Sequence, residues 1–163
     1  MDEFRDCIKY EAGPRPHLYH GTKKTIASVI ISDNYIKPGI TSGYLGYGVY
    51  CYDLDHVAAK LWAKKRFPKD NIAVLRINAD LGTLLFVSKE IYTIVNSRAL
   101  KIKEDFGEVL EEIIINKLES IYGIIHTVAR NYHLNTFTES RDALMYSIRK
   151  DDLVKNISLF LEE

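Results

Sequence analysis

Two short stretches of the chain combine residue types that suit recognition of a flat ring carrying an amide. Residues 18–22 read Leu-Tyr-His-Gly-Thr, so an imidazole is followed at once by a glycine and a hydroxyl. Residues 43–52 hold three glycines and four tyrosines. Aromatic side chains can sandwich a flat ring, and glycine lets the backbone approach closely enough to pair with an amide. The alternative is that these tyrosines simply alternate across a half-exposed strand.

Other nucleotide-binding and metal-binding patterns find no support in the sequence. No glycine-rich loop is followed by Lys-Ser/Thr, which excludes a P-loop. Gly43, Gly46 and Gly48 precede an expected strand instead of joining a strand to a helix, the wrong context for a dinucleotide-binding turn. The five histidines show no metal-ligand spacing, so we expect no metal site. No local spacing indicates a catalytic triad, although one assembled from distant positions stays open.

The elements that must position these stretches are short strands with helices inserted between them. Thr22 is the expected cap of a first helix, and a second begins after Asp53 or Asp55 and ends at Pro68. The absence of regular βαβ alternation indicates an α+β fold, and we expect a single domain over residues 1–163. Expected strands cover residues 17–20, 48–52, 71–77, 82–87, 122–128 and 142–148, and a third helix covers 106–120. Residues 33–48 are expected to form a long loop with one short strand, and residues 130–141 a polar loop. An apolar run covers 153–161.

Together the two stretches resemble the diphtheria-toxin and poly(ADP-ribose)-polymerase (His-Tyr-Glu type) branch of the ADP-ribosyltransferase superfamily. That branch opens its site with Tyr/Leu-x-His-Gly-Ser/Thr, matched at residues 18–22, and continues with Gly-x-Gly-x-Tyr, matched at 46–50. A helix with a second aromatic follows, and an acidic residue begins a late strand, here residues 142–146. The agreement in order and spacing covers roughly residues 17–157. It implies split mixed and antiparallel sheets with inserted helices around a central NAD cleft.

The resemblance implies a role in NAD⁺ binding for four matched residues. His20 would hydrogen-bond the 2′-hydroxyl of the adenosine ribose. Gly21 would pair its backbone N–H and C=O with the nicotinamide carboxamide, and any side chain there would crowd the ring. Thr22 would contact the ribose or the amide as well as cap its helix, and Tyr50 would stack on the nicotinamide.

The acidic residue and the second aromatic depart from the family pattern. Asp142 stands where a glutamate is expected, and Glu139 is a second candidate nearby. Such a carboxylate would stabilise the positive charge that develops on the ribose as the bond to nicotinamide breaks, and would orient the acceptor. Leu61 takes the register-matched aromatic position. Trp62 beside it therefore forms the opposite wall of the pocket or fills the core.

The function implied by the resemblance is mono-ADP-ribosylation of a macromolecular acceptor, protein or nucleic acid, with NAD⁺ as co-substrate and nicotinamide released. By family analogy we expect an intracellular toxin or defence effector held in check by an inhibitory partner protein. The alternatives are a module that binds NAD⁺ or ADP-ribose without transfer, an enzyme related to RNA 2′-phosphotransferase, and plain NAD⁺ hydrolysis.

Composition agrees with a globular cytoplasmic protein. Lysine and arginine number 22, as do aspartate and glutamate, so the net charge is zero and gives no support for unspecific nucleic-acid binding. A lysine cluster at residues 60–69 reads as the solvated face of one helix. We expect no export signal and no membrane span, and two free thiols at Cys7 and Cys51.

Overall fold

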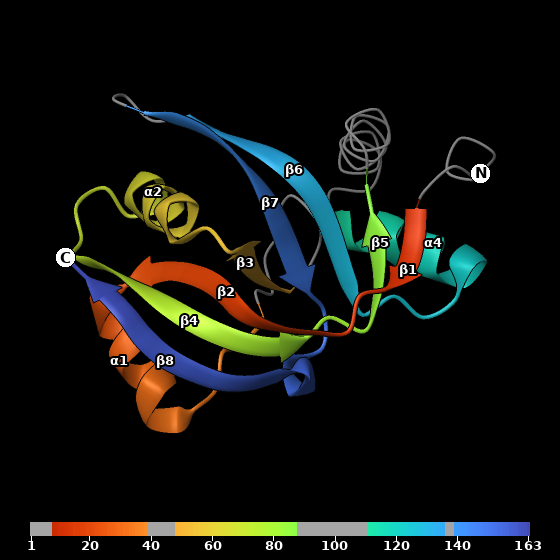
Figure 1. Cartoon of the computed structure of the whole chain (residues 1–163), viewed down its shortest axis with the longest axis horizontal. Coiled ribbons are helices and arrows are strands. Elements are labelled where there is room, and N and C mark those ends of the chain that lie inside the picture. Colours follow the sequence, from red (N-terminus) through yellow and green to blue (C-terminus); the bar gives the residue numbers. More distant parts are fainter. Residues whose placement is uncertain (1–7, 39–47, 88–110, 136–138) are drawn as a thin grey trace.

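The fold is a mixed α/β arrangement built on one large mixed sheet (Figure 1). The computed structural model describes residues 8–38, 48–87, 111–135 and 139–163. Its elements are β1 (Ile8–Glu11), β2 (Pro14–Lys23), α1 (Lys24–Asp33), β3 (Val49–Asp53), α2 (His56–Arg66), β4 (Ile72–Asp80), β5 (Thr83–Phe86), α4 (Glu111–Tyr122), β6 (Thr127–Asn135), β7 (Ser140–Ile148), the 3₁₀ turn η2 (Asp151–Leu153) and β8 (Val154–Glu162).

The sheet contains eight strands in the order β1-β5-β6-β7-β3-β2-β4-β8 within the described ranges. Among these described strands, only β5 and β6 run parallel; the other neighbouring pairs are antiparallel. In Figure 1, β1, β5, β6 and β7 form one half of the sheet, and β2, β4 and β8 form the other. The short strand β3 joins the two halves, because it pairs with β7 on one side and with β2 on the other.

Helices pack on both faces of the sheet. α1 packs against β2, β4 and β8, and α2 lies in the angle between β2 and the β6–β7 hairpin (Figure 1). The core is accordingly divided into two clusters. One, which includes Tyr19, Ala59 and Met145, lies on the side of α2 and α4. The other, which includes Leu18 and Ile30, lies on the side of α1.

The α2 helix owes its position to small side chains and a well-defined start. Asp55 caps it, because its Oδ1 accepts from the Ala58 N–H at 2.9 Å. Three of its fully buried residues are alanines, at positions 58, 59 and 63, so the helix can approach the sheet closely. Three basic residues occupy the last turn, where their positive charges interact favourably with the negative end of the helix dipole.

Several predicted elements need correction. Thr22 does not cap α1: it is a buried strand residue paired with Ala73, and the helix begins at Lys24. The strand predicted over 122–128 is wrong except for its last two residues, since α4 runs to Tyr122 and β6 begins at Thr127. The polar segment predicted as a loop over 130–141 instead holds most of β6 and the start of β7. Much of the predicted loop 33–48, including residues 39–47, lies outside the described residues.

Candidate functional site

The candidate site begins where β2 and β3 separate. The two strands pair only at Leu18 with Asp53 and at Tyr19 with Tyr52. Beyond these pairs β2 remains on β4, where Gly21 lies opposite Val74. β3 remains on β7. The sheet therefore divides next to the His-Gly pair that the sequence singled out.

The backbone N–H and C=O of Gly21 point toward β3, into the gap between the separated strands. Along a β-strand these groups alternate between the two neighbours, so odd and even residues face opposite sides. In β2 the His17 carbonyl faces β3, since it accepts from the Leu54 N–H at 3.0 Å. The Lys24 N–H faces β4, since it donates to the Asn71 carbonyl at 2.9 Å. Gly21, an odd residue, therefore faces the β3 side, two positions beyond the last β2–β3 pair.

Glycine is required at position 21 by the helix behind it. A Cβ placed there would lie 2.1 Å from the Ala59 carbonyl oxygen and 2.9 Å from the Ala63 Cβ. Both distances are too short for non-bonded atoms, so α2 could not pack this closely on β2 if a side chain were present. The close approach of α2 thus explains the glycine independently of any ligand.

His20 is held by the carbonyl of Tyr50 across the same gap. Its Nδ1 lies 2.6 Å from the Tyr50 oxygen. Burial lowers the pKa of His20, and the hydrogen bond to Tyr50 raises it by less. The ring is therefore neutral near pH 7, and Nδ1 carries the proton because a carbonyl oxygen can only accept. Nε2 is left as a hydrogen-bond acceptor.

The aromatic residues lie on the α2 side of the sheet. Tyr50 is half-buried, and both it and Trp62 pack against the core cluster on that side. Trp62 also contacts the edge of Phe67 at 6.5 Å between ring centroids, and the Arg66 guanidinium lies 5.9 Å from its ring centre. The structure brings the backbone carbonyl of Tyr50 to His20, whereas the Tyr50 ring lies on the opposite face and Trp62 lies in the second half of α2.

The two predicted acidic residues lie away from His20. Asp142 is paired in register with His133 at the outer end of β7, and its Oδ1 lies 2.6 Å from the His133 Nδ1. The β7 residue opposite Tyr50 is Ser147. Asp142 is five residues from it, which corresponds to about 16 Å along the strand. Glu139, before β7, lines a pocket on α2 instead.

Asp53 is a carboxylate that the sequence analysis considered only as a helix cap. The cap is Asp55, and Asp53 ends β3 opposite Leu18. Cross-strand partners share a face of the sheet, as do residues two apart, so Asp53 lies on the face that carries Leu18 and His20. Burial, and secondly the charge of Asp53, raise the pKa of Cys51 and of Tyr146. Both shifts place the negative charge of Asp53 close to these neighbours.

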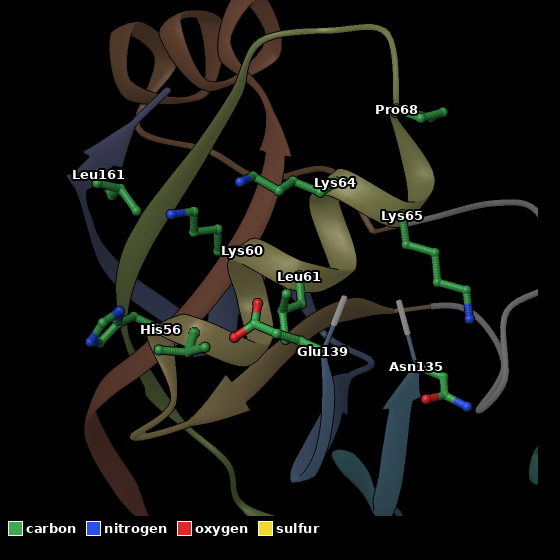
Figure 2. A pocket seen from close by; sticks show the side chains of 10 residues that line it. His56, Lys60, Leu61, Lys64, Lys65, Pro68, Asn135, Glu139 and Leu161 are labelled. Carbon is green, nitrogen blue, oxygen red and sulfur yellow. The ribbon is translucent and has the colours of Figure 1, made fainter. Parts of the chain in front are cut away.

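A separate pocket of about 720 Å³ lies on the outer side of α2 (Figure 2). Lys60 and Lys64 extend across it from the helix, and both form ion pairs with Glu163. Its lining residues are His56, Val57, Lys60, Leu61, Lys64, Lys65, Pro68, Asn135, Glu139 and Leu161. Neither His20 nor Tyr50 belongs to this pocket.

The function proposed below rests on the geometry of the site. Over the described residues, no group of three or more His, Cys, Asp or Glu side chains could hold a metal ion. No helix in this part of the chain is long and apolar enough to cross a membrane. Comparison of the chain with protein-family models, with curated proteins and with solved structures gives no match.

Proposed function

We propose that this chain is a NAD-dependent ADP-ribosyltransferase, which moves one ADP-ribose unit to a macromolecular acceptor and releases nicotinamide. The observation that carries the proposal is the arrangement of two adjacent residues at the point where β2 and β3 separate. The backbone N–H and C=O of Gly21 face the gap, and the neutral ring of His20 lies next to them. A primary carboxamide presents one acceptor oxygen and an N–H donor, and Gly21 presents the complementary N–H and C=O to the gap.

His20 and Tyr50 complete the binding contribution. The Nε2 of His20 accepts from a ribose hydroxyl, because Nδ1–H is already committed to the Tyr50 carbonyl. The hydrogen bond from Nδ1–H to the Tyr50 carbonyl fixes the orientation of the His20 ring, as the partner of a functional histidine commonly does. Tyr50 contributes its backbone carbonyl, because its ring lies on the α2 face of the sheet, opposite to the face of His20.

The chemical step needs a carboxylate near the ribose, and geometry favours Asp53 over Asp142. When the bond to nicotinamide breaks, the ribose develops oxocarbenium character, which a nearby negative charge stabilises. Asp53 shares the face of His20 and lies three residues along β3 from the carbonyl that His20 binds. Asp142, the candidate from resemblance, lies on the outer hairpin with His133.

The test is nicotinamide release from NAD⁺ by the purified chain, with and without cell lysate. We expect release by the wild type, stimulated by lysate, and a fall of about 10²-fold in His20→Gln and in Asp53→Asn. Asp142→Asn is the matched carboxylate variant. If it abolishes release while Asp53→Asn does not, the carboxylate role belongs to Asp142.

A second function, NAD⁺ binding without transfer, is favoured by one observation. The register holds Asp142 and Glu139 away from the His20–Tyr50 pair, so the site resembles the family in its binding half more than in its acidic half. Binding of NAD⁺ by a folded wild type that releases no nicotinamide would establish this function and exclude the transferase.

A further inference from the structure

A serine, a histidine and an aspartate form a continuous chain of hydrogen bonds on the β6–β7 hairpin, outside the site at β2 and β3. The Ser140 Oγ lies 3.1 Å from the His133 Nε2, and the His133 Nδ1 lies 2.6 Å from the Asp142 Oδ1. This is the connectivity by which an aspartate orients a histidine and the histidine activates a serine hydroxyl. No local sequence pattern indicates it, because the three residues come from two strands.

The register of the hairpin explains why the three side chains meet. His133 on β6 is paired directly with Asp142 on β7. Ser140 is two residues from Asp142, so it emerges on the same face of the hairpin and is the diagonal neighbour of His133. Arg141 points to the other face, where its Nε lies 2.8 Å from the Asp55 Oδ2 and ties the hairpin to α2.

The proton positions follow from the partners. A carboxylate can only accept, so the His133 Nδ1 carries the proton and its N–H donates a hydrogen bond to the Asp142 Oδ1. The Nε2 is then the acceptor for the Ser140 hydroxyl, and can take its proton when oxygen attacks an electrophile. Ser140 is exposed, and the side chains of His133 and Asp142 are 53% and 83% exposed, so the serine is accessible to a large reactant.

We propose that Ser140 is an ADP-ribose acceptor, modified in trans by the NAD⁺ site of a second copy of this chain. This rests on the proposed transferase function. An oxocarbenium-like electrophile needs an accessible, base-assisted oxygen and no oxyanion hole, which matches what the hairpin offers.

The transfer forms one bond and breaks another at the same carbon atom. The Ser140 Oγ bonds to the C1 carbon of the nicotinamide-side ribose, and the bond from that carbon to the nicotinamide nitrogen breaks. The bonding pair leaves with nicotinamide, which becomes neutral. The serine proton passes to the His133 Nε2, and Asp142 stabilises the imidazolium until the proton is lost to water.

Distance along the sheet indicates that the reaction occurs between chains. Ser140 is seven residues along β7 from Ser147, the residue opposite Tyr50. That separation is about 23 Å along the strand, too far for the serine to reach the site of its own chain. Ser140, which is exposed at the start of β7, is accessible to the site of another copy.

The experiment is mass spectrometry of peptides after incubation of the full chain with NAD⁺, with nicotinamide release measured in the same samples. We expect ADP-ribose on Ser140 in the wild type, none at that peptide in Ser140→Ala, and a rate about 10²-fold lower in His133→Gln. Ser28→Ala is the matched control, because Ser28 is an exposed serine whose hydroxyl donates to the Lys24 carbonyl and to no histidine. It should be modified at Ser140 like the wild type.

A mixture of two variants tests the trans step. His20→Gln keeps Ser140 but lacks the NAD⁺ site, and Ser140→Ala keeps the site but lacks the acceptor. We expect ADP-ribose on Ser140 of the first only when the second is present. Modification in the wild type but not in the mixture would overturn transfer in trans. Nicotinamide release with Ser140 unmodified would overturn the acceptor proposal and leave the transferase standing, whereas no release at all would overturn both.

Discussion

Replacing Gly21 with alanine tests the close contact between α2 and β2. The new Cβ would lie 2.1 Å from the Ala59 carbonyl oxygen, whereas ordinary contacts begin at 3.4 Å. The helix backbone would have to withdraw by more than 1 Å, because the obstructing atom is main chain and cannot rotate away. Overpacking typically costs about 1–3 kcal/mol, and a backbone obstruction belongs at the upper end. For a chain of this length, about 3 kcal/mol lowers Tm by roughly 6–12 °C.

The assay is thermal and urea unfolding of Gly21→Ala beside Gly13→Ala. A Cβ added at Gly13 would meet no atom within 4 Å, so the φ of +68° is the only source of strain there. A left-handed backbone costs an alanine about 1 kcal/mol, so Gly13→Ala should lose clearly less stability than Gly21→Ala. If Gly21→Ala were as stable as the wild type, α2 would not sit on β2 at this distance.

Three further predictions concern the cap of α2, a buried thiol and the pH dependence of stability. Asp55→Ala should lower the free energy of unfolding by about 1–2 kcal/mol, because it removes the helix cap. Arg141→Ala removes the ion pair with Asp55 but leaves the cap in place, so it should lose less stability in urea titrations. Equal losses of stability in the two variants would argue against the cap. Burial raises the pKa of the Cys51 thiol, so in a Cys7→Ser background a thiol reagent should label the chain only after unfolding; rapid labelling of the native state would contradict that burial. The lowered pKa of His20 means that its contribution to stability is fully present above pH 6.5 and is lost as pH falls through the folded-state value. Urea midpoints of the wild type should therefore fall below pH 6.5 more steeply than those of His20→Gln, and parallel profiles would show that His20 is not the group responsible.

Local signals in the sequence predicted the elements whose character is set by neighbouring residues. The alternation around residue 74 identified β4, and the apolar stripe after Asp55 identified α2, because burial imposes those periods directly. His20 was placed correctly in a strand, whereas Gly21 was expected after the strand end and in fact lies inside β2, which continues to Lys23. The capping preference of Thr22 was overridden by its pairing with Ala73, since a tertiary ladder outweighs a single cap.

Features that depend on pairing between distant strands could not be predicted from local sequence patterns. Asp142 was assigned to the right strand, but its distance from Tyr50 depends on the β3–β7 register, in which Tyr52 lies opposite Met145. The polar composition of residues 130–135 resembled a loop, because one face of the hairpin is open to solvent. The contact of Ser140 with His133 depends on that same hairpin register.

The most direct test of the central claim is a titration of the ¹⁵N-labelled chain with NAD⁺, followed by amide and imidazole chemical shifts. The Gly21 N–H faces the gap between β2 and β3, and His20 lies beside it. We predict that the largest shifts occur at Gly21 and at the His20 ring, with saturation as NAD⁺ is added. Shifts confined to Lys60 and Lys64 in the pocket on α2, or no shifts at millimolar NAD⁺, would contradict the placement of the site and the function proposed from it.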